Sequence, residues 1–246
     1  MIDQQKAKEA YEAYIDKATK DDRIIGIMLS GGRAKGVATE NSDYDVILIT
    51  TDDGIEGVTN DYPKTDYIDS IPKAITQFRE HAATGTRTQY DKDTFTHVTA
   101  LVDKTGEIQK LIDEKGTLEP DKVKKVAHDA LGGYLNSLHR SLKNFRDDNI
   151  LAAHLDAIET IPRILTFVFA IEHRVRPFNK FLAWELEQYP LVKLPMAAAD
   201  FLKIINTIAQ TGDAQTQIEF LVIMKTLALD NGYNDEIADW EGYYFG

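Results

Sequence analysis

The chain has 246 residues, of which 43% are hydrophobic, so it can bury a sizeable core and its length lies between one domain and two. Its 40 acidic residues outnumber the 28 basic ones and give a formal charge of -12, which argues against nucleic acid as a partner. There is no cysteine, which excludes disulfides and thiolate metal sites. Because the first residues lack an export signal and no apolar run reaches the roughly 18 residues of a membrane span, we expect a cytoplasmic protein with no membrane partner.

The first half of the chain mixes strand and helix patterns. A charged amphipathic segment opens it, and β-branched runs bounded by charge or glycine then predict strands. Pro72 is typical of a helix start, and the segment that follows it carries apolar residues at helical spacing. The predicted helices cover about residues 3–20 and 72–82, and the predicted strands cover residues 23–30, 44–50, 64–71 and 95–103.

The second half shows almost only the 3.6-residue periodicity of amphipathic helices. The predicted helices cover residues 121–146, 149–174, 178–188, 195–209 and 213–230. The sequence therefore predicts an α+β chain, in which a small mixed β-sheet flanked by helices is followed by an all-α helical bundle. We place the two domains at residues 1–117 and 118–246.

Two aspartates stand at the head of the second predicted strand. In "IMLSGGRAKGVATENSDYDVILIT", residues 27–50, a strand ends at a glycine pair, and Asp43 and Asp45 then precede a second apolar run. Side chains two apart on a strand project from the same face, so these carboxylates repel each other unless a positive group lies between them. Oxygen ligands in this arrangement suit Mg²⁺, which commonly binds one or two carboxylates together with substrate phosphates.

The loop between the two strands suits a triphosphate. Gly31 and Gly32 let the main chain approach phosphates closely, and turn N–H groups can cradle them. Arg33 and Lys35 would add positive charge. A glycine pair alone is more often a plain turn, and two aspartates alone are more often caps, but their order between two strands favours a site.

The stretch "GGRAKGVATENSDYDVIL" resembles the signature of the nucleotidyltransferase superfamily typified by DNA polymerase beta. It looks particularly like the "GSRARG…SDxDL" form of minimal nucleotidyltransferases and antibiotic-modifying adenylyltransferases. Gly32 stands where serine is frequent in that family. The resemblance implies a catalytic domain that uses ATP with two Mg²⁺ ions held by Asp43 and Asp45.

The resemblance also implies a third carboxylate on a following strand. Asp69, in "YIDSIPKAI", matches the family's pattern, and we expect it to act as a base or a metal ligand. Asp66 lies three residues earlier and would face the opposite way on an extended strand. Asp103 also ends a predicted strand, but Gly106 follows it, which favours a turn.

The helical half resembles the second domain of drug-modifying adenylyltransferases, which holds substrate and nucleotide. By this resemblance Lys180 is the candidate to reach the nucleotide phosphates, with Arg176 second. Glu159 lies in an otherwise apolar helix. It would act as a base or a substrate ligand if it faced the site. It would have a structural role if it formed an ion pair with Arg163 one turn later.

We therefore expect a Mg²⁺-dependent enzyme that transfers AMP from ATP to a hydroxyl of a small molecule and releases pyrophosphate. An acidic chain suits a polycationic acceptor such as an aminoglycoside antibiotic, which would make this a resistance enzyme. Two alternatives stay open: an antitoxin-like nucleotidyltransferase that adenylylates a protein, and a non-catalytic nucleotide-binding module of the same fold. The sequence leaves monomer and homodimer equally open.

Overall fold

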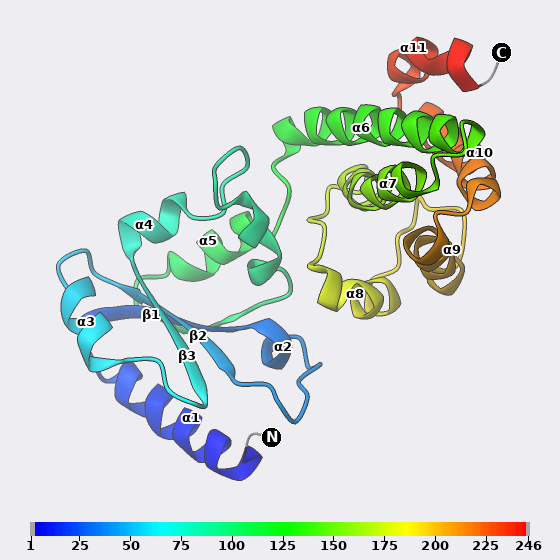
Figure 1. The fold of residues 1–246 in the computed structure, drawn as a ribbon. Helices are drawn as coiled ribbons and strands as arrows, with labels where there is room; N and C mark the ends of the chain where they lie inside the picture. The colour runs from blue at the N-terminus through cyan, green and yellow to red at the C-terminus, as the bar shows by residue number, and fades with distance from the viewer. Residues whose placement is uncertain (1–2, 245–246) are drawn as a thin grey trace. The chain divides into compact units, whose positions relative to one another are not determined.

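The computed structural model describes residues 3–244 and divides into two compact units, Met1–Thr117 and Leu118–Gly246 (Figure 1). The first unit combines a small mixed sheet with helices, and the second unit is helical. This confirms the predicted α+β fold class and the predicted change from mixed to all-helical structure.

The first unit is built on a sheet of four strands within the described part of the chain. The strands lie in the order β3-β2-β1-β4; β1 is antiparallel to both β2 and β4, whereas β2 is parallel to β3. The strands are β1 (Ile24–Ser30), β2 (Tyr44–Thr50), β3 (Ile68–Ala74) and β4 (Ala100–Asp103). The helices of this unit are α1 (Gln4–Thr19), α2 (Gly31–Ala34), α3 (Ile55–Asp61), α4 (Ile75–Glu80) and α5 (Ile108–Lys115), with the 3₁₀ helix η1 (Gln89–Phe95).

Helices cover both faces of this sheet (Figure 1). α1 and α3 pack on one face against a core that includes Val46 and Leu48 of β2. α4 and α5 pack on the other face against a core that includes Ile47 and Ile49. Because successive residues of a strand point to opposite faces, Asp45 projects from the same face as Ile47 and Ile49.

The prediction that Pro72 starts a helix is wrong. Pro72 lies inside β3, where it is the Cα partner of Leu48, and α4 begins only at Ile75. Proline is tolerated here because β3 is an edge strand, and an edge strand has no second neighbour that would need the missing N–H.

The predicted strand over residues 95–103 is shorter in the structure, where only β4 (Ala100–Asp103) is extended. His97 has a φ of +60°, a left-handed conformation that interrupts an extended strand. The turn after β4 is as predicted, because Asp103 Oδ1 accepts hydrogen bonds from the main-chain N–H groups of Thr105 and Gly106.

The second unit packs its helices around one hydrophobic core. Its helices are α6 (Pro120–Arg146), α7 (Ile150–Ala170), the 3₁₀ helix η2 (Asn179–Phe181), α8 (Leu182–Gln188), α9 (Ala198–Thr211), α10 (Ala214–Asp230) and α11 (Asn234–Tyr244). The C-terminal half of α7 is buried nearly throughout, which accounts for its continuous apolar sequence. The sequence did not predict α2, α3, α5 or α11.

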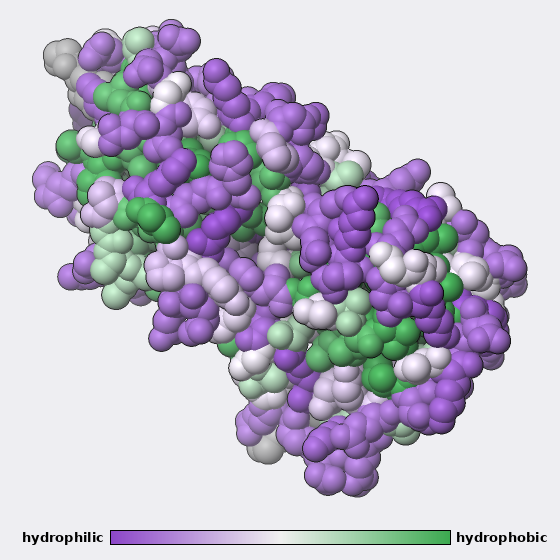
Figure 2. Space-filling view, turned by 180° about the vertical axis from the view of Figure 1, so that it is seen from behind, coloured by the Kyte–Doolittle hydropathy of each residue, from purple (hydrophilic) through white to green (hydrophobic). Residues whose placement is uncertain are grey.

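Hydrophilic side chains cover most of the face drawn in Figure 2, and hydrophobic side chains gather there in smaller areas. None of the helices in residues 3–244 combines the length and the apolar character that crossing a membrane requires.

Candidate functional site

The turn after β1 brings the main chain against a carboxylate. Gly31 follows Ser30 directly and has a φ of +68°. A Cβ atom added to Gly31 would lie 2.0 Å from Oδ2 of Asp45. Any other residue is therefore disfavoured twice, by the left-handed backbone and by overlap with the carboxylate. The sequence assigned this glycine to phosphate binding; the group that it approaches in the structure is Asp45.

The sheet brings the predicted carboxylates together. Asp45 and Asp69 are Cα partners in the parallel pairing of β2 with β3, so their side chains leave the same face from adjacent positions. Asp43 immediately precedes β2, two residues before Asp45. Asp45 is also the register partner of Ser30 at the end of β1, which places the carboxylates beside the glycine turn.

Lys64 lies among these acids and was not predicted from the sequence. Its Nζ is 3.0 Å from Oδ1 of Asp69. The pKa of Lys64 is raised, first by the hydrogen bond with Asp69 and the charge of that residue, and further by the charges of Asp43 and Asp45. One ammonium group thus experiences the field of all three carboxylates. It pairs directly with Asp69 and acts on Asp43 and Asp45 only through its charge.

The Lys64 ion pair is exposed to solvent. The Lys64 side chain is 64% exposed and that of Asp69 is 31% exposed, so water screens the attraction between them. Lys64 carries one positive charge, which can balance only one of the three carboxylates. In the sequence, nothing distinguishes Lys64 from any other lysine of a polar loop.

Arg33 supports the site through the main chain of the loop before β2. Its guanidinium donates hydrogen bonds to the carbonyl oxygens of Asp43 at 3.0 Å and Ser42 at 2.6 Å, and to Oε1 of Gln4 at 2.7 Å. It also lies 3.8 Å from the ring centre of Tyr44. These contacts fix the backbone that carries Asp43. Arg33 therefore has a positioning role in this structure, in addition to the phosphate contact predicted for it.

Lys35 is unsuited to the phosphate contact that the sequence suggested. Its ammonium is buried, 3.0 Å from Oδ1 of Asp93 and 2.8 Å from Oγ1 of Thr96. A buried pair of opposite charges is costly to separate, so this contact anchors the end of α2 to η1, which contains Asp93.

The three candidates from the helical half are Glu159, Lys180 and Arg176, and all lie in the second unit. Glu159 is 62% exposed and forms an ion pair with Arg140 of α6, which also binds Asp156. The predicted alternative of a structural ion pair thus has Arg140 as its partner instead of Arg163. Lys180 is exposed in η2, with its ammonium 5.3 Å from the ring centre of Phe181.

Arg176 is half-buried near Lys180. It donates a hydrogen bond to Oδ1 of Asn179 at 2.8 Å, and its buried Nε has no hydrogen-bond partner. Burial lowers its pKa from the ordinary arginine value.

Within residues 3–244, no group of three or more histidine, cysteine, aspartate or glutamate side chains is arranged to hold a metal ion as it stands. Mg²⁺ does not require such a group, because it usually binds one or two carboxylates and takes its other ligands from water and substrate phosphates. The oxygen donors of Asp43, Asp45 and Asp69 fit that chemistry. The opposing feature is the Lys64 ammonium, which a divalent cation would have to displace from Asp69.

Neither a protein-family model nor a curated protein sequence matches the chain. Among solved structures, the fold is similar to that of a nucleotidyltransferase-like protein from Exiguobacterium sibiricum 255-15. The two chains are 11% identical, and the match covers 97% of this chain and 78% of that one with a TM-score of 0.47. A similarity at this level identifies neither an activity nor the residues of a site.

Proposed function

We propose that this chain is a Mg²⁺-dependent nucleotidyltransferase, which transfers AMP from ATP to a hydroxyl group of a small molecule and releases pyrophosphate. The observation that carries the proposal is the register pairing of Asp45 with Asp69 on neighbouring strands. This pair lies beside the glycine turn, and Asp43 precedes Asp45 by two residues. The sequence motif and the sheet register thus point to the same three carboxylates.

The electrostatics of the site support a cation ligand. Like charges held close together destabilise one another unless a positive group lies between them. Lys64 offers a single charge on an exposed side chain, so it compensates three carboxylates only in part. Bound Mg²⁺ would supply the remaining charge and neutralise the triphosphate during attack on its α-phosphorus.

Each site residue of the first unit has a distinct role in this proposal. Asp43 and Asp45 hold the metal-bound nucleotide, and Gly31 keeps the main chain close to the carboxylate of Asp45. Arg33 holds the main chain of Asp43 in place. Asp69 accepts the proton of the acceptor hydroxyl, and Lys64, which contacts it, moves aside when the nucleotide binds.

The helical unit would hold the acceptor and part of the nucleotide. Lys180 is exposed, so a ligand can reach its ammonium group, and it remains the candidate for the phosphate contact. Glu159 is a weaker candidate for the base than Asp69, because Asp69 is the register partner of Asp45, whereas Glu159 lies in the second unit and pairs with Arg140. An aminoglycoside-type acceptor remains an expectation from the sequence.

One observation favours a different function, a nucleotide-binding module without catalysis. No ready-made metal site of three ligands is present in the described residues, and Lys64 already pairs with Asp69. Titration calorimetry with ATP separates the two functions. A catalytic site requires Mg²⁺ for tight ATP binding, whereas a module that uses Lys64 as its cation binds ATP equally well with and without Mg²⁺.

The direct test is a pyrophosphate-release assay with ATP and Mg²⁺ against a panel of aminoglycosides, lincosamides and simple sugars. With the accepted substrate, Asp45→Asn should reduce the rate by about 10²- to 10³-fold, the usual effect of removing one electrostatic contact to a reacting group. Asp53→Asn is the matched control, because Asp53 is an exposed aspartate of the same unit. Turnover by Asp45→Asn equal to that of Asp53→Asn would refute the mechanism.

A further inference from the structure

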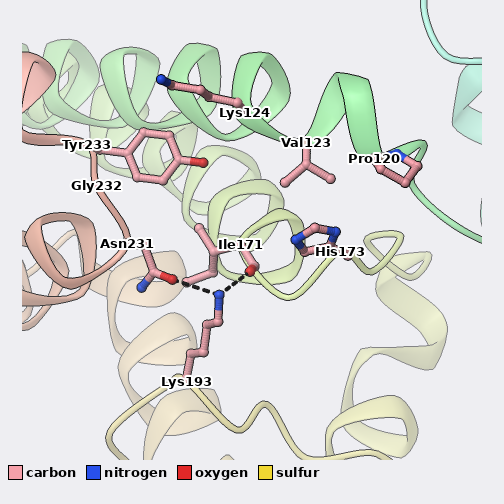
Figure 3. A pocket seen from close by; sticks show the side chains of 9 residues that line it. All are labelled: Pro120, Val123, Lys124, Ile171, His173, Lys193, Asn231, Gly232 and Tyr233. Atoms are coloured by element: carbon pink, nitrogen blue, oxygen red, sulfur yellow. Dashed lines mark hydrogen bonds between the residues drawn. The ribbon is translucent and has the colours of Figure 1, made fainter.

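An open cavity of about 410 Å³ lies at the surface of the helical unit (Figure 3). The first turn of α6, the segment after α7, the loop before α9 and the loop between α10 and α11 form its wall. Side chains that line it include Val123, Ile171, His173, Lys193, Asn231 and Tyr233. This volume is within the range of pockets that bind small organic ligands. All the lining residues belong to the second unit, so the cavity is independent of the carboxylates of the first.

The charge of this cavity is opposite to that of the chain. Within residues 3–244, no acidic residue lines it, although the chain carries 40 acids and 28 bases. Lys193 Nζ donates hydrogen bonds to the carbonyl oxygen of Ile171 at 2.6 Å and to Oδ1 of Asn231 at 2.8 Å. Both acceptors are neutral. Glu172 is the neighbouring carboxylate, but its Oε1 accepts from the main-chain N–H of Lys193 instead of pairing with the ammonium.

Lys193 therefore has capacity for an anionic ligand. An ammonium group carries three N–H donors, and two are used within the protein. Among the described residues, no carboxylate forms an ion pair with its Nζ. Lys124 also lines the cavity, but Figure 3 shows its ammonium pointing away from that of Lys193, so it contributes only at longer range.

Tyr233 presents a second unused donor. The residue is only 7% exposed, and its ring packs edge-on against Phe167 with 5.5 Å between the ring centres. Figure 3 shows its hydroxyl pointing into the cavity, and the hydroxyl makes no hydrogen bond to any described residue. Burial raises the pKa of Tyr233, so the hydroxyl stays protonated and can donate. The hydroxyl is therefore available to donate a hydrogen bond to a ligand atom in the cavity.

His173 lies on the other side of the cavity from Tyr233 (Figure 3). It has a φ of +60°, a conformation that is rare outside glycine and costs stability. This conformation closes the C-terminal end of α7, where the N–H of Arg174 donates to the carbonyl oxygen of Phe169 at 3.0 Å. The ring of His173 supplies a third potential donor, and Val123 and Ile171 supply apolar surface between the donors.

We propose that this cavity binds a small organic oxyanion, that is, a carboxylate or phosphate group on an apolar body. Lys193 and Tyr233 donate to the anionic group, His173 assists, and Val123 and Ile171 contact the apolar body. The site belongs to the helical unit alone and does not depend on the proposed nucleotidyl transfer.

The test measures the binding of three small molecules of similar shape to the whole 246-residue protein. Binding is measured by titration calorimetry and by NMR. Benzoate and phenyl phosphate carry the two anionic groups, and benzamide is the neutral counterpart. We expect at least one anion to bind with a Kd at least about tenfold lower than that of benzamide, since hydrogen bonds to charged groups are the stronger ones. Comparison of the two anions identifies which group the cavity prefers.

Two variants locate the binding. Tyr233→Phe keeps the ring packing and removes one hydrogen bond, so it should raise the Kd about fivefold. Lys193→Met should raise it by at least about tenfold. Lys203→Met is the control, since Lys203 is an exposed lysine of the same unit. Because Lys193→Met also removes contacts to Ile171 and Asn231, Tyr233→Phe provides the test that leaves the fold intact.

The proposal is overturned if benzamide binds as well as benzoate and phenyl phosphate, or if none of the three binds at millimolar concentration. It is also overturned if Tyr233→Phe and Lys193→Met bind the anions as tightly as Lys203→Met. Binding that weakens in both variants and persists in the control supports it.

Discussion

Replacement of Gly31 by alanine is the sharpest perturbation of the carboxylate cluster, because it leaves every charge in place. The added methyl group would lie 2.0 Å from Oδ2 of Asp45. Nonbonded heavy atoms essentially never lie within 3.0 Å of a Cβ atom. Either the carboxylate of Asp45 or the turn at residue 31 must therefore move by roughly 1 Å. Gly31→Ala therefore tests whether the position of the Asp45 carboxylate matters.

The expected effect has two parts. Alanine in a left-handed conformation costs about 1 to 2 kcal/mol of stability. Displacement of a catalytic group by 1 Å can reduce a reaction rate about a hundredfold. The first part concerns folding, and the second appears only if Asp45 binds the metal and nucleotide.

Gly36→Ala separates the two parts. Gly36 lies in the same loop with a φ of +72°, and a Cβ added there meets no atom within 4 Å. It therefore carries the same backbone strain without any displacement of Asp45. Urea denaturation should show a loss of stability in both variants, and a larger one in Gly31→Ala, which also carries the overlap with Asp45.

The functional measurements are calorimetric titration of ATP in the presence of Mg²⁺ and, once an acceptor is known, pyrophosphate release. Gly31→Ala should bind Mg²⁺-ATP more weakly and lose about a hundredfold in rate, whereas Gly36→Ala should match the unmodified protein. Equal binding and equal rates in the two variants would show that the close approach of Gly31 to Asp45 has no functional role.

Two further predictions concern charge. Lys64→Gln removes the ammonium that competes with a metal ion for Asp69. The affinity of this variant for Mn²⁺, measured by electron paramagnetic resonance, should therefore be severalfold higher than that of the unmodified protein. A lower affinity would mean that Lys64 assists metal binding instead of competing with it. Hydrogen bonds from Arg23 hold the pKa of Asp21 at about 2, below the ordinary 3.8. Because the folded-state pKa is lowered, this stabilisation is complete above pH 4 to 5 and is lost as the pH falls towards 2. Asp21→Asn should thus lower the free energy of unfolding by about 1 kcal/mol at pH 7, with allowance for solvent screening, and urea denaturation should show the difference closing at acid pH. A difference that does not depend on pH would contradict this reasoning.

The sequence by itself determined the features that follow from local periodicity. Continuous apolar runs marked β1 and β2, because both faces of these central strands are covered, and helical spacing marked the bundle. The turn at Gly31 and the position of Asp45 at a strand head were also local features. Asp69 was reached through resemblance to a family, and the register of β2 with β3 places it beside Asp45.

Only the tertiary structure decided which charged groups meet. Lys35 pairs with Asp93, 58 residues away in the chain, and nothing in the sequence near either residue indicates the contact. The same holds for Lys64 beside the carboxylates. An ion pair depends on the distance between two charges in space, and that distance is set by the packing of whole elements.

The cavity of the helical unit shows the same limit. Lys193 and Tyr233 lie in separate loops, and each looks unremarkable in the sequence. Helical periodicity states which face of a helix is buried, but it does not state where the ends of several helices leave a space. The hydroxyl of Tyr233 and the ammonium of Lys193 share one cavity because the C-terminal end of α7, the start of α6 and the loop after α10 converge there.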